Sequence, residues 1–130
     1  MKPGKQTVIS PNGPKAIGPY SAGVKIDSYV FTSGQLGLDP ISNELVSGGI
    51  EAETMRALEN LQLLLESAGS GLSDVVKTTV FLKDIQDFGK MNNIYAKFFS
   101  ENPPARSALQ VAALPKGAAV EIEAIAVITH

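Results

Sequence analysis

Residues 118–128 are predicted to form a strand that is apolar on both faces, and this feature limits the possible folds more than any other. In the two-residue repeat of a strand, Val120 and Ile122 face one side, while Ile125 and Val127 face the other. A sheet with one solvated face alternates more cleanly between apolar and polar residues. Both faces of this strand therefore need cover from other parts of the protein.

Two segments have the period of an amphipathic helix, at 49–68 and at 85–100. In each, apolar residues recur at steps of three or four and mark the face expected to be buried. The first stripe comprises Met55, Leu58, Leu61, Leu65 and Ala68, and the second comprises Phe88, Met91, Tyr95 and Phe98.

The other periodic segments indicate a sheet. We expect strands at 7–9, 22–27, 29–33 and 75–82, and a hairpin of 106–112 with 118–128 around the loop 114–117. This order of elements predicts an α+β fold of one sheet and two helices.

Right-handed crossovers would place both helices on the same face of that sheet. The opposite face would then be uncovered, although the strands around Val30, Val75 and Ile125 carry apolar residues on both sides. We therefore expect a homo-oligomer whose subunits bury the second face and whose interfaces hold the pockets.

The sequence has no cysteine, and its only histidine is His130. These absences exclude disulfide scaffolds, zinc ribbons and thiol nucleophiles, so we expect no metal site. The net charge of −2 gives no reason to expect a nucleic acid partner. The chain shows no targeting signal and no run of about 18 apolar residues, so we expect a cytoplasmic protein with no membrane partner.

Arg106 and Glu121 are the strongest candidates for chemistry. Arg106 follows two prolines that fix the approach of the chain, and a guanidinium matches the paired oxygens of a carboxylate. Glu121 and Glu123 share a strand face with apolar neighbours, where a carboxylate can hold or activate a water. Spacing alone leaves open that Arg106 is a surface residue or forms an ion pair between subunits. It also leaves open that the two glutamates pair with Lys or Arg across a subunit interface.

The sequence also contains weaker candidates for a binding site. Tyr20 follows Gly18 and Pro19 and is either the wall or lid of a pocket or a partly buried anchor. Ser33 and Gly34 end a strand and could present a hydroxyl and an N–H group to a ligand, or could be a simple strand end. Asn92 faces away from the apolar stripe of its helix, as an exposed amide would.

Four stretches together are more specific than any of these residues alone. In their order and separation they closely resemble the RidA (YjgF) family of reactive-intermediate deaminases over nearly the whole chain. The stretches are residues 16–21, 31–35, 76–84, and 104–107 continuing through 114–116 to 120–127.

The resemblance implies a fold similar to trimeric chorismate mutase, with one RidA-like domain over residues 1–130. It implies a homotrimer in which the sheets form a central barrel with three clefts between subunits. The implied reaction is hydrolysis of 2-enamino and 2-imino acids, such as 2-iminobutanoate and 2-iminopropanoate, to 2-oxo acids and ammonia without a cofactor.

By the same resemblance, Arg106 binds the substrate carboxylate and Glu121 orients or deprotonates the attacking water. Tyr20, Ser33, Gly34 and Asn92 match pocket positions. Ala108 stands where many members carry cysteine, and its backbone carbonyl is expected to help hold the water. Two other functions stay open: a ligand-binding regulatory or chaperone-like module that uses the same clefts, and a ribonuclease, which the acidic composition disfavours.

Overall fold

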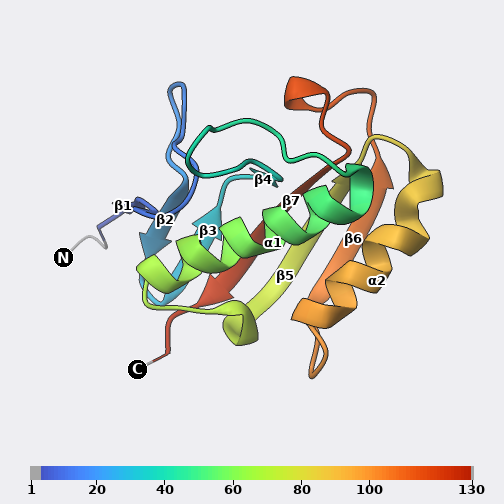
Figure 1. Ribbon diagram of the computed structural model, residues 1–130. Coiled ribbons are helices and arrows are strands. Elements are labelled where there is room, and N and C mark those ends of the chain that lie inside the picture. The colour runs from blue at the N-terminus through green and yellow to red at the C-terminus, as the bar shows by residue number, and fades with distance from the viewer. Residues whose placement is uncertain (1–3, 130) are drawn as a thin grey trace.

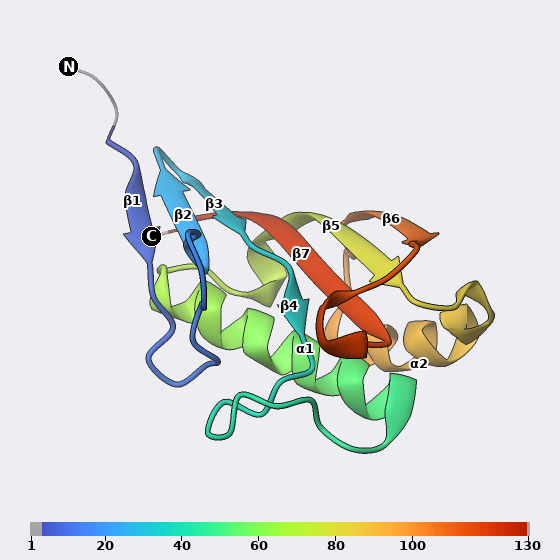
Figure 2. The same cartoon turned by 90° about the horizontal axis from the view of Figure 1, so that it is seen from above.

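The computed structural model describes residues 4–129, so His130 lies outside the described part of the chain. One sheet carries two helices on the same face, as Figures 1 and 2 show. The strands are β1 (Gln6–Val8), β2 (Gly23–Ile26), β3 (Tyr29–Thr32), β4 (Gln35–Leu36), β5 (Val75–Leu82), β6 (Ala105–Gln110) and β7 (Val120–Val127). The helices are α1 (Gly49–Ser67) and α2 (Phe88–Phe98), and 3₁₀ turns cover Leu72–Asp74, Ile85–Asp87 and Pro115–Gly117. The predicted α+β arrangement is confirmed.

The last strand of the chain lies in the interior of the sheet. The strand order is β1-β2-β3-β7-β5-β6, and β4 also pairs with β7. The β5–β6 pair is parallel and the others are antiparallel. Along β7, buried residues alternate with half-buried ones, starting from buried Val120. The predicted division of this strand into two faces is therefore confirmed.

The predicted hairpin of 106–112 with 118–128 is wrong. β6 pairs with β5, and β7 enters the sheet on the other side of β5. The chain leaves β5, crosses through α2 and returns as β6, and such a crossover produces parallel neighbours. β6 is largely exposed and takes the edge, whereas the apolar β7 takes the interior.

The helices lie where the periodicity placed them, with two local differences. Met55 is 38 % exposed rather than part of the buried stripe, because at 100° per residue it lies about 120° around the helix from Leu61. The second predicted helix begins with a 3₁₀ turn, Ile85–Asp87, before α2 starts at Phe88. Asp84 caps that turn by accepting a hydrogen bond of 2.9 Å from the N–H of Gln86.

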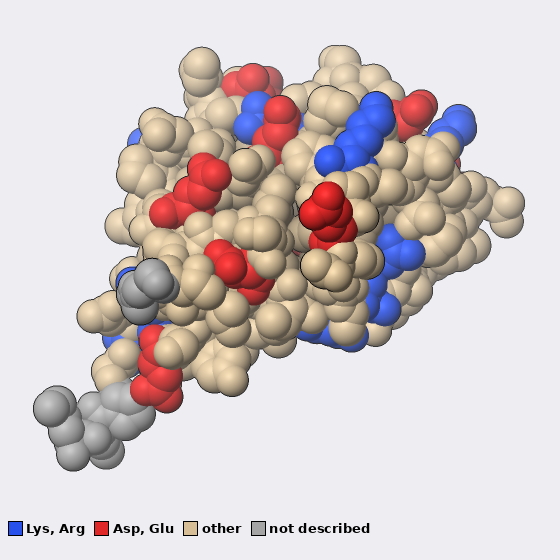
Figure 3. All heavy atoms as spheres, turned by 90° about the horizontal axis from the view of Figure 1, so that it is seen from below, with Lys and Arg blue, Asp and Glu red and all other residues tan. Residues whose placement is uncertain are grey.

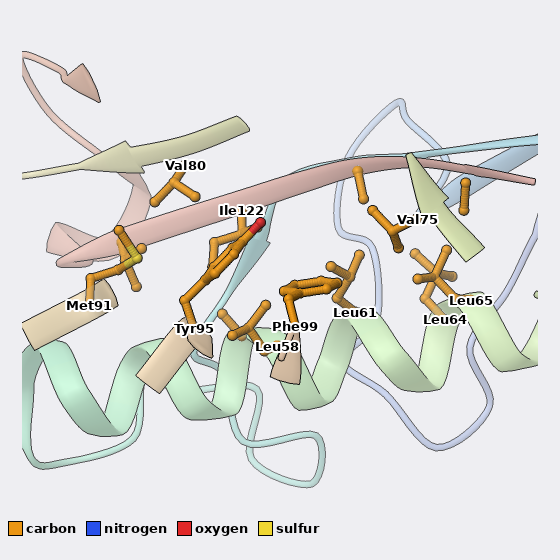
Figure 4. Close-up of a cluster of buried hydrophobic side chains, with 14 of the residues drawn as sticks. Leu58, Leu61, Leu64, Leu65, Val75, Val80, Met91, Tyr95, Phe99 and Ile122 are labelled. Atoms are coloured by element: carbon orange, nitrogen blue, oxygen red, sulfur yellow. The ribbon is translucent and has the colours of Figure 1, made fainter. Parts of the chain in front are cut away.

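The hydrophobic core fills the layer between the helices and the sheet, as Figure 4 shows. Its largest fully buried side chains come from both helices and from the central strands. They include Leu58, Leu61, Leu64 and Leu65 of α1, Met91 of α2, Val80 and Leu82 of β5, and Ile122 of β7. These contacts hold α2 against β5 and thereby set the position of the residues that α2 presents to β6.

The other face of the sheet is open and carries exposed aromatic side chains on β3. Phe31 pairs with Ile125 and Tyr29 pairs with Val127, so the register places these two rings on the face away from the helices. Tyr29 is 48 % and Phe31 41 % exposed. Within residues 4–129 no helix is long and apolar enough to cross a membrane.

A buried amide ties the short strand β4 to α1. Asn60 is 1 % exposed and donates hydrogen bonds of 3.1 Å to the carbonyl of Leu36 and 2.9 Å to that of Leu38. Its Oδ1 accepts a bond of 3.1 Å from Nε of Arg56. Gly37, which follows the end of β4, packs directly on α1. A Cβ on Gly37 would lie only 2.6 Å from the Cα of Glu53.

We predict that Asn60→Ala lowers the free energy of unfolding by about 1–3 kcal/mol, because it removes a buried amide that donates to the carbonyls of Leu36 and Leu38. Chemical denaturation measures the change. Gln62→Ala is the matched control, since it removes an amide of the same helix that bonds only to exposed Glu66, and we expect less than about 0.5 kcal/mol. Equal effects of the two variants would contradict this role of Asn60.

Candidate functional site

Apart from Ala108, the residues predicted to form the site line two separate cavities. The first, which we call the Glu121 cavity, has a volume of about 310 Å³ and lies between the 14–22 loop, the start of β4 and the turn before β7. The second, the Arg106 cavity, has a volume of about 340 Å³ and lies between α2 and β6. Tyr20, Ser33, Gly34 and Glu121 line the first, whereas Asn92 and Arg106 line the second.

The strand register explains this separation. Arg106 lies opposite Thr78, which in turn lies opposite Ala124, and both of these are buried on the helix side. Glu121 lies opposite Phe81. Because strand residues alternate between faces, Arg106 and Glu121 lie on opposite faces of the sheet. One chain therefore does not bring the two groups together around a small ligand.

The Glu121 carboxyl is pressed against Gly34. A Cβ at Gly34 would overlap the Glu121 carboxyl group, so only glycine admits this contact. Burial raises the pKa of Glu121, and the neighbouring carboxylate of Glu123 raises it further. A half-buried carboxyl with a raised pKa beside a cavity is suited to exchange protons with a bound water.

Ser33 uses both its hydroxyl and its N–H in hydrogen bonds that hold the wall of the Glu121 cavity together. Its hydroxyl donates a hydrogen bond of 2.6 Å to the carbonyl of Ser21, and its N–H donates one of 2.9 Å to the carbonyl of Ala22. These bonds attach the 14–22 loop to the end of β3. Tyr20, on the same loop, is 55 % exposed at the cavity, so it forms an open wall rather than a buried anchor.

Sequence reasoning missed the rim of the Glu121 cavity. Asn43 accepts a hydrogen bond of 2.9 Å at its carbonyl from Nζ of Lys116, and one of 3.3 Å at Oδ1 from the N–H of Lys15. Asn43 and Lys116 both have left-handed backbones, with φ of 60° and 59°. These bonds join three loops that are far apart in sequence, and local patterns carry no signal for such a junction.

The Arg106 guanidinium is held by α2. Its Nη1 donates a hydrogen bond of 2.7 Å to Oδ1 of Asn92, so Asn92 is not the ordinary exposed amide that its helix position suggests. Its Cζ lies 4.7 Å from the ring centre of Tyr95 and 5.3 Å from that of Phe88. The Asn92 bond uses one N–H donor and leaves others for a bound anion.

The Tyr95 hydroxyl lies in the core beneath Arg106. It shares a hydrogen bond of 2.7 Å with Oγ1 of Thr78, and either atom can be the donor. Burial raises the pKa of Tyr95, and the hydrogen bond to Thr78 and the charge of Arg106 oppose that rise. The phenol is therefore neutral at physiological pH and serves Arg106 through its ring face.

Ala108 lies on the same strand face as Arg106, opposite Val80 of β5, and packs partly against the core. Its side chain lines neither of the two cavities described above. Over residues 4–129, no group of three or more acidic or histidine side chains is placed to hold a metal ion.

Comparison with known proteins places this geometry in a family. The family model described as Endoribonuclease L-PSP matches residues 10–128. The human protein named 2-iminobutanoate/2-iminopropanoate deaminase is 50 % identical over 123 residues, which cover 95 % of this chain and 90 % of the human one.

Solved structures agree with the sequence comparison. The crystal structure of RidA from an Antarctic Psychrobacter species is 46 % identical, with a TM-score of 0.91 over 95 % of this chain and 99 % of that one. The structure of E. coli TdcF with bound serine is 40 % identical, with a TM-score of 0.90 over 95 % of this chain and 99 % of that one. The chain therefore belongs to the Endoribonuclease L-PSP family, which includes the RidA and YjgF proteins.

Proposed function

We propose that this protein hydrolyses 2-imino acids, including 2-iminobutanoate and 2-iminopropanoate, to 2-oxo acids and ammonia. The observation that carries the proposal is the 50 % identity, over 95 % of the chain, to a human protein named for this activity. The bound serine of the TdcF structure supports it as well, since serine carries an α-carboxylate and an α-nitrogen as a 2-imino acid does.

The reaction needs only water, orientation and proton transfer. Water adds to the carbon of the protonated imine and forms a C–O bond, while the C=N bond becomes a C–N single bond. Loss of ammonia from this carbinolamine then gives the 2-oxo acid, and no oxidation state changes overall. Fixing the carboxylate and placing the water supply most of the rate gain in such a step, and no cofactor is required.

In this mechanism Arg106 binds the substrate carboxylate. The guanidinium has N–H donors to spare beyond its bond to Asn92, and it lies on aromatic rings that orient its plane. A planar fork of donors matches the two oxygens of a carboxylate. Bound in this way, the substrate presents its imine carbon at a defined distance from the guanidinium.

Glu121 receives a proton from the attacking water. Its raised pKa makes it a stronger base than an ordinary glutamate, and the absence of a side chain at Gly34 leaves its carboxyl room at the cavity wall. We assign Ser33 and Tyr20 to the walls of this pocket. The backbone carbonyl of Ala108 is proposed to hold the same water, a role that does not require the thiol found in many relatives.

We infer that three copies assemble and that each site forms between two of them. Arg106 of one subunit would reach the Glu121 cavity of the next, because the two groups lie on opposite faces of a single sheet. The open face, with Tyr29 and Phe31 exposed, supports burial against other copies. A single small substrate molecule would then span two half-sites that one chain keeps apart.

A ribonuclease function has less support. On the face drawn in Figure 3, basic and acidic side chains are interspersed rather than gathered into a positive patch. A non-catalytic module would bind the same carboxylates without turnover, so the assay below distinguishes it from the deaminase.

We predict that Arg106→Ala lowers kcat/KM about 100-fold or more, because it removes a charge-assisted bidentate contact. Arg106→Lys is expected to rescue little, since an ammonium lacks the planar fork. The assay releases 2-iminobutanoate in situ from threonine with a threonine dehydratase and follows 2-oxobutanoate. Lys97→Ala, an exposed cation of α2, is the control. Wild-type rates in Arg106→Ala, or no acceleration by the native protein, would overturn the proposal.

We predict that the acid limb of the pH–rate profile lies above the ordinary range of a glutamate. A raised pKa means that Glu121 takes up its proton at a higher pH, so the basic form is lost earlier as the pH falls. Glu123→Gln removes one cause of that rise and should move the limb to lower pH.

Glu121→Gln should keep the affinity for 2-oxobutanoate while slowing turnover by about 10²–10⁴-fold. The pH–rate profiles of the native protein and of Glu123→Gln are corrected for spontaneous imine hydrolysis at each pH. An acid limb that Glu123→Gln leaves in place, together with full activity of Glu121→Gln, would remove Glu121 from the mechanism.

A further inference from the structure

We propose that Tyr95 and Thr78 act together as positioning residues for the Arg106 guanidinium. The inference rests on the proposed role of Arg106 in carboxylate binding. It extends that role to a buried hydroxyl pair that touches no substrate in the mechanism above.

The Tyr95 ring packs against the Arg106 guanidinium. The Arg106 Cζ lies 4.7 Å from the centre of the Tyr95 ring, closer than the 5.3 Å to Phe88. Asn92 holds one edge of the guanidinium through the 2.7 Å bond to Nη1. A planar cation held at its face and at one edge keeps little rotational freedom, and its remaining donors point in a fixed direction.

The Tyr95 ring is itself held in place by its neighbours. The Tyr95 hydroxyl shares the 2.7 Å bond with Thr78, and the Tyr95 ring packs on that of Phe99 with centres 4.7 Å apart. Figure 4 shows Tyr95 rising from α2 with its hydroxyl toward the sheet. Thr78 lies directly opposite Arg106 in the β5–β6 register. Two residues paired in the sheet therefore hold the contact: Arg106 provides the cation, and Thr78 fixes the ring that the cation packs on.

Core stability alone does not explain the hydrogen-bonded hydroxyls of Tyr95 and Thr78. Tyr95 is 5 % and Thr78 0 % exposed, and Tyr95 belongs to the cluster of buried apolar side chains that forms the core. Replacing both partners of such a bond with apolar groups of the same shape is often nearly neutral for stability. The directional bond gives the ring one tilt, whereas phenylalanine against valine would allow several.

The test compares ligand affinity with turnover in four variants of the full-length protein. Tyr95→Leu removes the ring, and we expect the Kd for 2-oxobutanoate and the KM for the imine to rise about tenfold while kcat stays within about twofold. Tyr95→Phe keeps the ring and should restore the affinity to within about threefold of wild type. Thr78→Val leaves the phenol unpaired and should raise Kd about threefold or more. Adding Tyr95→Phe should restore stability but not affinity, because no hydrogen bond then fixes the tilt of the ring.

Leu61→Ala is the control for loss of core packing. It removes a fully buried side chain of α1 that touches neither cavity, so it should lower the midpoint of thermal unfolding and leave Kd unchanged. Should Tyr95→Leu not fold, the Thr78→Val and Tyr95→Phe pair carries the test, since both keep the shape of the core.

Wild-type affinity in Tyr95→Leu and in Thr78→Val, with binding lost in Arg106→Ala, would overturn this inference and leave the proposed function standing. Wild-type affinity in Arg106→Ala would instead remove the carboxylate anchor and the inference with it. An equal loss of affinity in Leu61→Ala would show that the effect of Tyr95 comes from general loosening of the core, and this too would overturn the inference.

Discussion

The alternation of side chains across β5, β6 and β7 is the constraint on which the rest of the structure depends. One set of residues, including Val80 and Ile122, builds the core against the helices. The other set faces away, onto an open surface that carries Glu121 and Glu123 as well as the exposed rings of Tyr29 and Phe31. The same alternation assigns Arg106 to one face and Glu121 to the other. Core formation, the exposed aromatic surface and the separation of Arg106 from Glu121 therefore have a common origin.

The chemistry proposed for the site follows from how each half is built. On the helix side, a cation lies on aromatic rings and is tied to an amide, an arrangement that directs its free donors toward an anion. On the open side, a carboxyl with a raised pKa lies against Gly34, where a Cβ would overlap it. Neither half alone holds both Arg106 and Glu121.

Much of the fold could be predicted from local pattern, and the failures have a common cause. Periodicity located both helices and the two faces of β7, since these depend on neighbours along the chain. It failed for β6, because strand order depends on the crossover through α2 and on which strand can occupy the interior of the sheet. Met55 was misassigned because each step of three residues falls about 60° short of a full turn, so two such steps from Leu61 leave the buried face.

The site could be predicted only as a set of residue types. Arg106 and Glu121 stood out through their chemistry and through a family resemblance, but their separation on opposite faces required the register. The bond between Arg106 and Asn92, the Asn43 junction and the buried pair of Tyr95 with Thr78 join segments far apart along the chain. Nothing in the spacing of these residues indicates that they meet.

The central claim, that Arg106 and Glu121 act on one substrate from two different subunits, is tested most directly by mixing two inactive variants. Arg106→Ala and Glu121→Gln are unfolded together in equal amounts, refolded, and assayed for hydrolysis of 2-iminobutanoate. Random assembly gives about a quarter of the sites both an intact arginine and an intact glutamate, so about a quarter of wild-type activity should return. Activity no greater than the sum of the two variants refolded separately would contradict the shared site.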